Sequence, residues 1–461
     1  MLRTTDDSAS PSQQHNHSQL ALKKARRTIR NRFRNLLSAG MQSEREQPQR
    51  KRSQSRKSRL EPLEGRQMMA GDVPEITSGL LNFYLADIAT DEAIVQVHSG
   101  DVVPAELLEG REVTLFAEAK TDQIEHQIKS VRIEVPGIAS RTENKTPYSV
   151  TGDRGGDFRR SIDLEGNVEV IASAHSRFGA RGDVLEAVDF NFRIESDPTR
   201  SILDVTDLPD EILDSNPGLV SAVPGDDVDD LPAIDAAIAW LSDQLESGQA
   251  ESATLYLPEG TYLVSGSIDV DAAIDIQGAG SNQTRLAAIP TFGFDGTQIS
   301  DNGISVQSVT RDGYLIDFDR NSDGASLRDV ELYGPQMIGG VFAFRSDDLE
   351  ISQTRFDTFL WSGLRTFNLT GSEIHNNEFF DAGGRKVKAD GSFGVTGGGI
   401  FSTFHDDSSV YNNDFLRRDD REVNFFGIKG RKWSESRIHH NTINTSFSVE
   451  LPFENDRAVE I

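Results

Sequence analysis

The sequence predicts an all-β protein whose C-terminal part is a parallel β-helix, and residues 339–461 carry this prediction. An apolar residue is followed ten positions later by a second one in five successive units: Val341/Ile351, Leu364/Ile374, Ile400/Val410, Ile428/Ile438 and Val449/Val459. Glycine precedes four of the first members, and the distance between units varies from 21 to 36 residues. The ten-residue offset within each unit is constant, whereas the length of the units varies. This is typical of two short strands joined by a corner of constant length and followed by a turn that can carry loops. Stacked units of this kind form a solenoid.

A recurring asparagine marks the turn after the second strand. Asn377, Asn413 and Asn441 each lie three residues after the second apolar residue, and a large apolar residue follows two positions later. The asparagines either stack as a buried ladder, in which each amide bonds to the amide one coil away, or simply tolerate a left-handed turn. The pattern resembles the right-handed parallel β-helix of pectate-lyase-like proteins, and this resemblance implies the ladder.

Charge divides the chain into two parts. Residues 1–66 hold 16 Lys and Arg against 6 Asp and Glu, a net charge of +10, so the remaining chain carries −37. The low hydrophobic content of residues 1–72 predicts a disordered basic leader. Basic arms often bind nucleic acid, but a body of charge −37 would repel phosphates. We therefore expect no nucleic-acid partner.

Residues 60–71 resemble the Leu-Glu-Pro N-terminal motif of secreted planctomycete proteins, which follows a basic leader and precedes the mature chain. That motif usually has arginine after the proline and two leucines near its end, where this chain has Leu63, Met68 and Met69. The resemblance implies an extracellular or cell-surface protein. No apolar stretch is long enough for a transmembrane segment. The sequence has no cysteine, which excludes disulfides, thiolate metal sites and a cysteine nucleophile.

Residues 77–195 predict a β-sandwich. Apolar residues alternate at period two in the segments that begin at Val113, Val131, Val168 and Val188, and a turn cluster lies at 152–157. Residues 141–148 resemble a fibronectin- or Ig-like module, which implies a spacer or a carbohydrate-binding accessory domain. Acidic residues in the turns could hold calcium, although acids in turns are usually only solvated.

Residues 196–228, with four prolines among many acids, predict a linker. A helix is expected to follow, capped by Asp230 and with Pro232 in its first turn. Its apolar face is Ile234, Ile238, Leu241 and Leu245. Such a helix could cover the open end of the solenoid, which would otherwise expose a strand edge.

The segment after this helix resembles the first coils of the pectate-lyase-3-type superfamily. It contains Leu-Pro-Glu-Gly-Thr-Tyr at 257–262 and Gly-Ala-Gly at 278–280, and the resemblance extends over 229–461. The Gly-Ala-Gly turn is not a dinucleotide fingerprint, because no third glycine follows. The sequence stops within the fifth unit, so we expect either a truncated C-terminus or a second chain that covers this end.

Residues that follow the first apolar member of each unit should point outward, because side chains alternate along a strand. They are Phe342, Arg365, Phe401, Lys429 and Glu450. Coils lie about 4.8 Å apart, so these residues should form one exterior column. Its mixture of aromatic, cationic and acidic groups suits sugar stacking and carboxylate recognition, although an ordinary solvated face is the alternative. Insertions at 383–390 and 417–422 leave the stack at one corner, and these loops could form walls beside the column.

Two reactions fit these residue types. A lyase needs a base, for which Lys429 and His405 are candidates, and a cation that neutralises a uronate carboxylate, for which Arg365 and Arg431 are candidates. A hydrolase needs two carboxyl groups, about 5–5.5 Å apart if retaining and about 6.5–9.5 Å if inverting. Its candidates are Asp406, Asp407 and Glu450; we expect His405, Asp406 and Asp407 beyond the end of the strand that contains Ile400.

The family's known catalytic patterns are incomplete in this chain. Polygalacturonases of this fold carry Asn-Thr-Asp, Asp-Asp, His-Gly and Arg-Ile-Lys motifs, of which only fragments such as Asp406-Asp407 and Ile428-Lys429 are present. The calcium-binding aspartates of pectate lyases are not evident, so no cofactor is expected with certainty, although calcium could bind. His375, His439 and His440 fall in outward or turn positions, which disfavours a zinc site.

These observations lead to two functional hypotheses. The first is an extracellular polysaccharide-binding protein that acts as a polysaccharide lyase or a glycoside hydrolase on a polysaccharide that could be acidic. The second is a non-catalytic surface or adhesion scaffold, because a fold alone does not determine function. A convergent pair of catalytic groups in the column would favour the enzyme.

Overall fold

The computed structural model describes residues 79–120, 125–290, 299–300, 303–304, 313–382, 386–387, 393–394, 398–417, 426–444 and 447–450. The predicted leader and the C-terminal end of the chain lie outside the described residues. Within the described ranges, no helix is long and apolar enough to cross a membrane.

Residues 79–195 form two larger sheets that share one apolar core, and a two-stranded hairpin of β8 (Asp153–Arg154) and β9 (Asp157–Phe158). The four-stranded sheet has the order β2 (Glu92–Val97), β1 (Leu81–Asp87), β4 (Val113–Ala119) and β7 (Tyr148–Ser149). The five-stranded sheet has the order β3 (Val102–Pro104), β11 (Arg181–Glu195), β10 (Gly166–Arg177), β5 (Ser130–Val135) and β6 (Ala139–Glu143). All pairs are antiparallel except β3 with β11. Leu85 and Leu115 of one sheet pack in the same buried cluster as Ile133 and Phe192 of the other.

The segment expected to be a linker contributes regular structure. It contains β12 (Arg200–Asp204), which pairs in parallel with β13 (Ser252–Leu257), and α3 (Asp210–Ser215). The two adjacent apolar residues Ile202 and Leu203 are too short a run to distinguish β12 from a loop in a proline-containing segment. The stack therefore begins one strand earlier than the sequence predicted.

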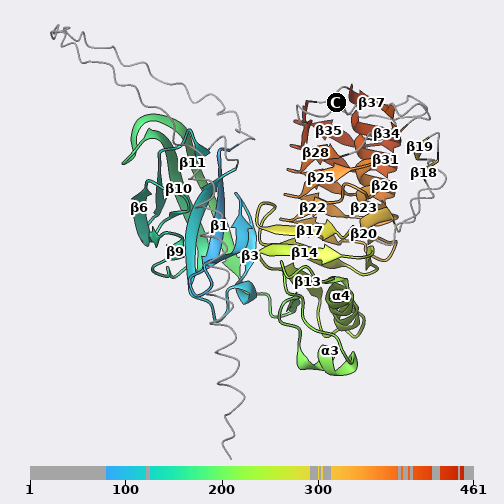
Figure 1. Ribbon diagram of the computed structural model, residues 1–461, viewed down its shortest axis with the longest axis horizontal. Helices are drawn as coiled ribbons and strands as arrows, with labels where there is room; N and C mark the ends of the chain where they lie inside the picture. Colours follow the sequence, from blue (N-terminus) through green and yellow to red (C-terminus); the bar gives the residue numbers. More distant parts are fainter. Residues whose placement is uncertain are drawn as a thin grey trace, which may run out of the picture. The chain divides into compact units, whose positions relative to one another are not determined.

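The described residues from 200 to 450 form a parallel β-helix built from three parallel sheets, accompanied by α3, α4 (Leu231–Glu246) and two short hairpins (Figure 1). The first sheet continues from β12 and β13 through β16 (Ile274–Gly278), β21 (Ser326–Arg328), β24 (Glu350–Ser352), β27 (Glu373–His375), β32 (Ser409–Tyr411) and β35 (Arg437–His439). The second contains β14 (Gly260–Val264), β17 (Thr284–Ala288), β22 (Glu331–Tyr333), β25 (Arg355–Phe359), β28 (Glu378–Ala382), β33 (Asp414–Leu416) and β36 (Thr442–Ile443). The third contains β15 (Ile268–Val270), β20 (Tyr314–Phe318), β23 (Gly339–Phe344), β26 (Ser362–Thr370), β31 (Gly398–Asp406), β34 (Phe426–Ser434) and β37 (Phe447–Glu450). The predicted fold class is confirmed.

The apolar pairs of the sequence repeat form the core of this β-helix. Val341, Leu364, Ile400 and Ile428 are fully buried and lie in register across the third sheet. Their partners ten residues later, Ile351, Ile374, Val410 and Ile438, lie in register across the first sheet. The ten-residue offset is thus the number of residues along the chain from a buried position in the third sheet to the matching buried position in the first sheet, around a corner of constant length.

The asparagine ladder is confirmed. Asn377 Nδ2 donates to Asn413 Oδ1 at 2.9 Å, and Asn413 Nδ2 donates to Asn441 Oδ1 at 2.9 Å. Both amides also donate to backbone carbonyls of the neighbouring coil, so the buried polar groups are satisfied. Beside the ladder, the rings of Phe356, Phe379 and Phe415 stack with centroid distances of 4.5 and 4.7 Å.

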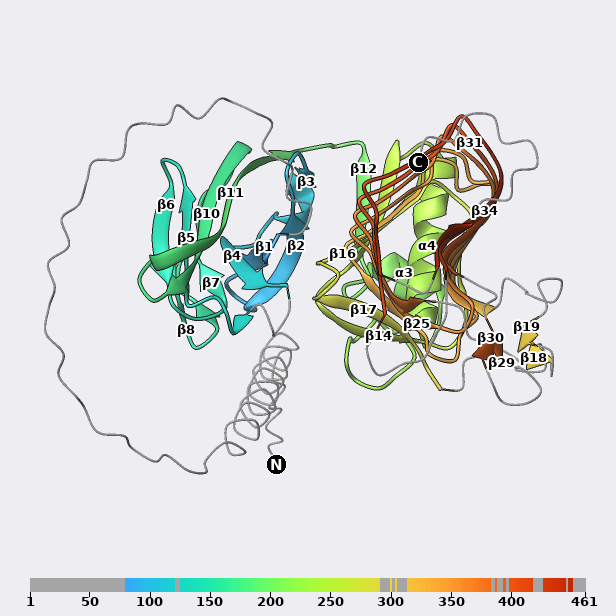
Figure 2. The same ribbon diagram turned by 90° about the horizontal axis from the view of Figure 1, so that it is seen from above.

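Helix α4 (Leu231–Glu246) covers the first coil, as the sequence predicted. It buries Ala233, Ile234, Ala237, Ile238 and Leu241 in the same cluster as the first strands of the β-helix, and it lies within the outline of the coils in Figure 2. The expected capping role of the Asp230 side chain is wrong. Its carboxylate instead accepts hydrogen bonds from the backbone N–H groups of Val223 and Leu263, at 3.1 and 2.9 Å.

Candidate functional site

The exterior column lies on the outer side of the third sheet, in the predicted register. Phe342 pairs with Arg365, Arg365 with Phe401, Phe401 with Lys429, and Lys429 with Glu450. The side chain of Glu450 lies outside the described residues. The core residues on either side point inward, so strand alternation places these five positions on the outside.

The column extends two coils further than the sequence analysis proposed. Asp317 of β20 pairs with Phe342, and Asp269 of β15 pairs with Asp317. Asp269 is exposed, whereas Asp317 is only 5% exposed. The two aspartates occupy neighbouring coils, whose backbones are about 4.8 Å apart. The ten-residue repeat could not find them, because it does not extend to these coils.

Arg365 lies in a box of aromatic rings. Its Cζ atom is 4.8 Å from the ring centroid of Trp361, 5.5 Å from that of Phe401 and 5.8 Å from that of Phe342. Trp361 and Tyr314 are completely buried and pack together, so the base of the box is rigid and apolar. Cation–π attraction of this kind positions a guanidinium group while leaving its N–H donors available.

Some donors in this box have no acceptor. Arg365 Nη1 and Trp361 Nε1 are both buried and make no hydrogen bond of standard geometry, and the same holds for Tyr314 Oη and Ser362 Oγ in the same box. The Tyr314 hydroxyl nevertheless lies close enough to Arg365 and Ser362 for their side chains to favour its ionised form. Burial raises the pKa of Tyr314 to about 12, although the nearby Arg365 opposes this shift. An unpaired buried donor costs free energy. Arg365 as a whole is only partly buried, so the other N–H groups of its guanidinium are the donors that a ligand on the outer face could reach.

Lys429 is half-buried and lies two coils from Arg365, which corresponds to about 10 Å along the stack. Arg431 is exposed and lies in the same strand, two residues further on, about 7 Å away. Arg431 pairs with Thr403 rather than with Phe401, so it belongs to the next outward row and not to the column. Lys429 and Arg431 are therefore closer to each other than either is to Arg365.

The proposed role of His405 as a base is contradicted by the structure. His405 lies within β31, not beyond its end, and is 1% exposed. Its Nε2 is 2.6 Å from Thr366 Oγ1, and its ring stacks on Trp433 with a centroid distance of 4.7 Å. Burial lowers the pKa of His405 to about 3. The neutral ring faces the core and cannot reach a substrate on the outer face.

The reason for this error is a break in strand alternation. Phe404 has a left-handed backbone, with φ of 61°, so both Thr403 and Phe404 point outward and His405 points inward. Strict alternation from Ile400 would have placed His405 outside. A phenylalanine gives no sequence signal for a left-handed residue.

Asp406 is the last residue of β31 and Asp407 follows it; both are exposed. Asp406 Oδ1 accepts a hydrogen bond from Ser434 Oγ at 2.6 Å, and the Asp407 N–H donates to the Ser434 carbonyl at 3.1 Å. Asp406 is five residues from Phe401, which corresponds to about 17 Å along the strand. These carboxylates are therefore not brought to the part of the column that contains Lys429.

Two hairpins lie beside the third sheet. They are β18–β19 (Ile299–Ser300, Gly303–Ile304) and β29–β30 (Lys386–Val387, Phe393–Gly394), and β19 contacts β29 (Figure 2). Both arise in connections from the second sheet to the third. The first was not predicted; most of the two predicted insertions lies outside the described residues.

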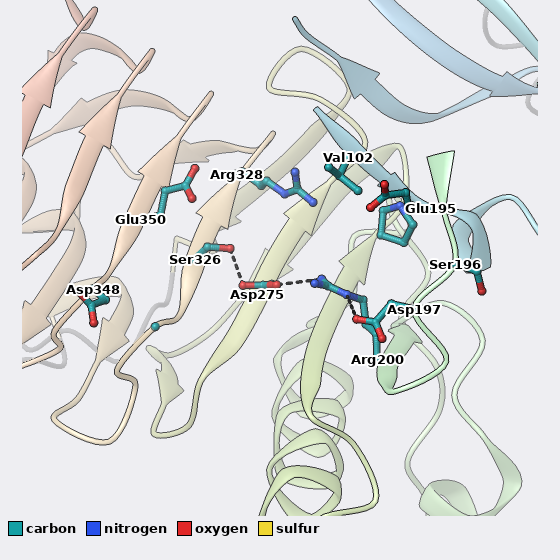
Figure 3. A pocket seen from close by; sticks show the side chains of 12 residues that line it. Val102, Glu195, Ser196, Asp197, Arg200, Asp275, Ser326, Arg328, Asp348 and Glu350 are labelled. Carbon is teal, nitrogen blue, oxygen red and sulfur yellow. Dashed lines mark hydrogen bonds and ion pairs between the residues drawn. The ribbon is translucent and has the colours of Figure 1, made fainter. Parts of the chain in front are cut away.

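A separate cavity of about 530 Å³ lies over the first sheet (Figure 3). Several of its charged and polar groups already have partners. Arg200 Nη1 contacts Asp275 Oδ2 at 3.1 Å, Ser326 Oγ donates to Asp275 Oδ1 at 2.7 Å, and Arg328 donates to Gln277 at 3.0 Å. The column, with its unpaired buried donors, is the better candidate for binding.

The described part of the chain contains no group of three or more His, Asp or Glu residues that could hold a metal ion. His375 stacks on Tyr411, and Tyr411 stacks on His439, on the outer side of the first sheet. His439 Nδ1 is 2.7 Å from His440 Nδ1, so these two rings are close neighbours. Calcium binding stays a prediction.

Residues 220–323 match a family model described as rhamnogalacturonase A/epimerase, pectate lyase-like. This region contains α4 and the first coils of the β-helix. No curated protein matches the chain.

Solved structures with similar folds include ORF18 of Geobacillus virus E2, which is 11% identical with a TM-score of 0.34. The match covers 61% of this chain and 54% of that one. A family 28 exopolygalacturonase of Yersinia enterocolitica is 9% identical, with 78% and 76% covered and a TM-score of 0.33. A tailspike protein variant of Escherichia coli bacteriophage HK620, solved with a hexasaccharide, is 13% identical, with 48% and 38% covered and a TM-score of 0.30. Likeness at this level carries no information on function.

Proposed function

We propose that this protein binds an acidic polysaccharide along the exterior column of the third sheet and cleaves it by β-elimination outside the cell. The observation that carries this proposal is the guanidinium of Arg365, which is held by aromatic rings and has a buried donor without a partner. The family model matched by residues 220–323 names pectate-lyase-like enzymes and supports a carbohydrate substrate.

A uronate carboxylate fits the donor set at Arg365. A planar guanidinium binds a carboxylate through charge-assisted hydrogen bonds, and three aromatic rings, with centroids within 5.8 Å of Arg365 Cζ, reduce its exposure to water. The same interaction is stronger in such surroundings than in bulk water. The rings of Phe342 and Phe401, which are half-buried, offer apolar faces to the sugar itself.

The cleavage step uses Lys429 and Arg431. Arg431 would neutralise the carboxylate of the sugar next to Lys429, which makes the proton on the adjacent carbon easier to remove. The amine of Lys429, in its neutral form, takes this proton, and the electron pair forms a carbon–carbon double bond. The glycosidic oxygen leaves from the neighbouring carbon with its bonding electrons and takes a proton from water. The products are a new reducing end and an unsaturated uronate. Arg365, two coils away, would hold a different sugar of the same chain.

A hydrolase is the second candidate, because Asp269 and Asp317 are paired in neighbouring coils of the column. Their backbone spacing of about 4.8 Å is close to the carboxyl separation of about 5–5.5 Å in retaining glycosidases. In that reaction, one aspartate would attack the sugar and the other would protonate the leaving oxygen.

The test is to incubate the full-length protein with polygalacturonate, rhamnogalacturonan, alginate and a neutral glucan, with and without calcium. Both reducing ends and the ultraviolet absorbance of unsaturated uronates are followed. The proposal predicts that both signals rise on an acidic polymer, and that Lys429→Ala lowers the rate about 100-fold or more. Asp406→Asn is the matched control and should leave the rate unchanged.

Reducing ends without absorbance, abolished by Asp317→Asn, would establish the hydrolase instead. Binding without any cleavage in the wild-type protein would contradict both reactions and favour a non-catalytic scaffold.

A further inference from the structure

A second outward row lies beside the column on the third sheet. Phe344 pairs with Phe367, Phe367 with Thr403, and Thr403 with Arg431. In each of these strands the next residue has a left-handed backbone and also points outward: Arg345, Asn368, Phe404 and Lys432, with φ of 56°, 60°, 61° and 54°. Each coil therefore presents two consecutive outward side chains here.

Three phenylalanines of this double row form a continuous cluster. The rings of Phe344 and Phe367 stack with a centroid distance of 5.6 Å, and Phe404 meets Phe367 edge-on at 5.3 Å. Two cations border the cluster: Arg345 Cζ is 5.2 Å from the ring centroid of Phe344, and Lys432 Nζ is 4.4 Å from that of Phe404. We call Phe344, Phe367 and Phe404 the aromatic platform.

Phe404 is poorly suited to its position on grounds of folding alone. A left-handed backbone is strained for a bulky side chain and is tolerated best by glycine and asparagine. Of the equivalent residues in the neighbouring coils, Asn368 fits this rule, whereas Arg345 and Lys432 are also left-handed without being glycine or asparagine. Phe404 is the aromatic residue among these four. Phe404 is moreover 37% exposed, so part of its ring faces the solvent. Strained residues of this kind concentrate at functional sites.

We infer that the aromatic platform is a second sugar-binding subsite, on which a pyranose ring of the acidic polysaccharide stacks its apolar face. This inference rests on the proposed function and extends it from the column to the neighbouring row. Arg345 and Lys432 border the platform and Arg431 lies in the same row, so a carboxylate on the stacked sugar meets positive charge. The acidic body of the protein disfavours a nucleic acid as the occupant.

The experiment measures the affinity of the full-length protein by electrophoresis in gels that contain polygalacturonate, rhamnogalacturonan or alginate, together with the Tm of each variant. Phe404→Asn should weaken binding about tenfold, because the stacking surface is lost. The same change should raise the Tm by about 1–3 °C, because asparagine relieves the left-handed strain. A merely structural ring would give the opposite change in Tm.

Two control variants show whether a loss of affinity in Phe404→Asn comes from the loss of the aromatic ring. Phe404→Trp keeps an aromatic face and should retain the affinity of the wild-type protein. Phe178→Asn changes an exposed phenylalanine in the turn between β10 and β11, which is 64% exposed and far from the third sheet in sequence, and should leave the affinity unchanged. An unchanged affinity of Phe404→Asn, or a Tm below that of the wild-type protein, would overturn the inference.

Failure of the platform and failure of the column can be distinguished. If Arg365→Met weakens binding and Phe404→Asn does not, the column stands and the platform is wrong. If the wild-type protein is not retarded in any gel, both proposals are wrong. High salt should reduce the effect of Arg365→Met, which is electrostatic, more than the effect of Phe404→Asn.

Discussion

The ring of Phe415 fills the space that a side chain on Gly399 would need. A Cβ atom added to Gly399 would lie 2.5 Å from Phe415 Cδ1. The same relationship recurs one coil away, where a Cβ atom on Gly363 would lie 2.7 Å from Phe379 Cδ1. The glycine before each apolar residue in the sequence repeat is therefore explained by the stack of phenylalanines, which occupies the opposite side of the coil.

This relationship predicts that Gly399→Ala lowers the free energy of unfolding by about 1–3 kcal/mol, because the added methyl group forces the ring of Phe415 to move. Phe415→Leu alone should also destabilise the protein, since it leaves a cavity in a packed core. The double variant should cost less than the sum of the two single changes. Guanidinium unfolding of the four proteins measures this coupling, and simple additivity would show that the two residues do not compete for space.

His405 predicts a pH dependence of stability. Its pKa is about 3 in the folded protein and about 6.5 when unfolded, so below about pH 6.5 the unfolded chain binds a proton that the folded chain excludes. This residue therefore lowers stability as the pH falls from about 6.5 towards 3, by up to about 1.4 kcal/mol per pH unit. His405→Gln should remove this contribution. The free energy of unfolding of the variant, relative to that of the wild-type protein, should therefore increase as the pH is lowered from about 6.5 to about 5.

The variant His405→Gln also tests whether His405 is a core residue or a catalytic base. Because His405 faces the core, the pH profile of any polysaccharide cleavage should be unchanged in His405→Gln. A lost alkaline or acidic limb of that profile would restore His405 as a base and contradict its assignment to the core.

Asp329 predicts the opposite dependence. Burial raises its pKa to about 6, while His98 and Arg328 lower it and Asp101 and Glu350 raise it. A carboxyl group whose folded-state pKa is raised is favourable when protonated, and this contribution is lost as the pH rises from about 4 through about 6. Asp329→Asn should therefore raise the free energy of unfolding by about 3 kcal/mol at pH 7 and leave it nearly unchanged at pH 4. Its left-handed backbone, with φ of 59°, also tolerates asparagine. Equal effects at both pH values would show that ionisation of this group is not the cause.

The repeating parts of the fold could be predicted from the sequence, because equivalent residues of successive repeats pair with one another in neighbouring coils. The ten-residue offset fixed the inward residues and the column, and the spacing of Asn377, Asn413 and Asn441 gave the ladder. The first coils could not be predicted in this way, because the corners between their strands differ in length from those of the later coils. Ile316 and Leu327, which belong to neighbouring strands of one coil, are eleven residues apart rather than ten. Asp269 and Asp317 were missed for this reason.

The candidate site was predicted less completely than the fold. Arg365, Phe401 and Lys429 lie in the predicted column, but their partners Trp361 and Tyr314 come from strand ends that carry no repeat. Asp406 and Asp407 were proposed from residue type alone, and distance along the strand separates them from Lys429. The left-handed residue at Phe404 reversed the orientation of His405, and only the backbone conformation reveals it.

The most direct test of the account is the affinity of the wild-type protein and of Arg365→Met for polygalacturonate and for its fully methyl-esterified form, measured by titration calorimetry. Methionine keeps much of the apolar contact with Trp361 and Phe401 while removing the charge. The account predicts that the wild-type protein prefers the acidic polymer by about tenfold or more, and that Arg365→Met removes this preference. Equal affinity of the wild-type protein for the two polymers, or an unchanged preference in Arg365→Met, would contradict the claim that Arg365 recognises a carboxylate.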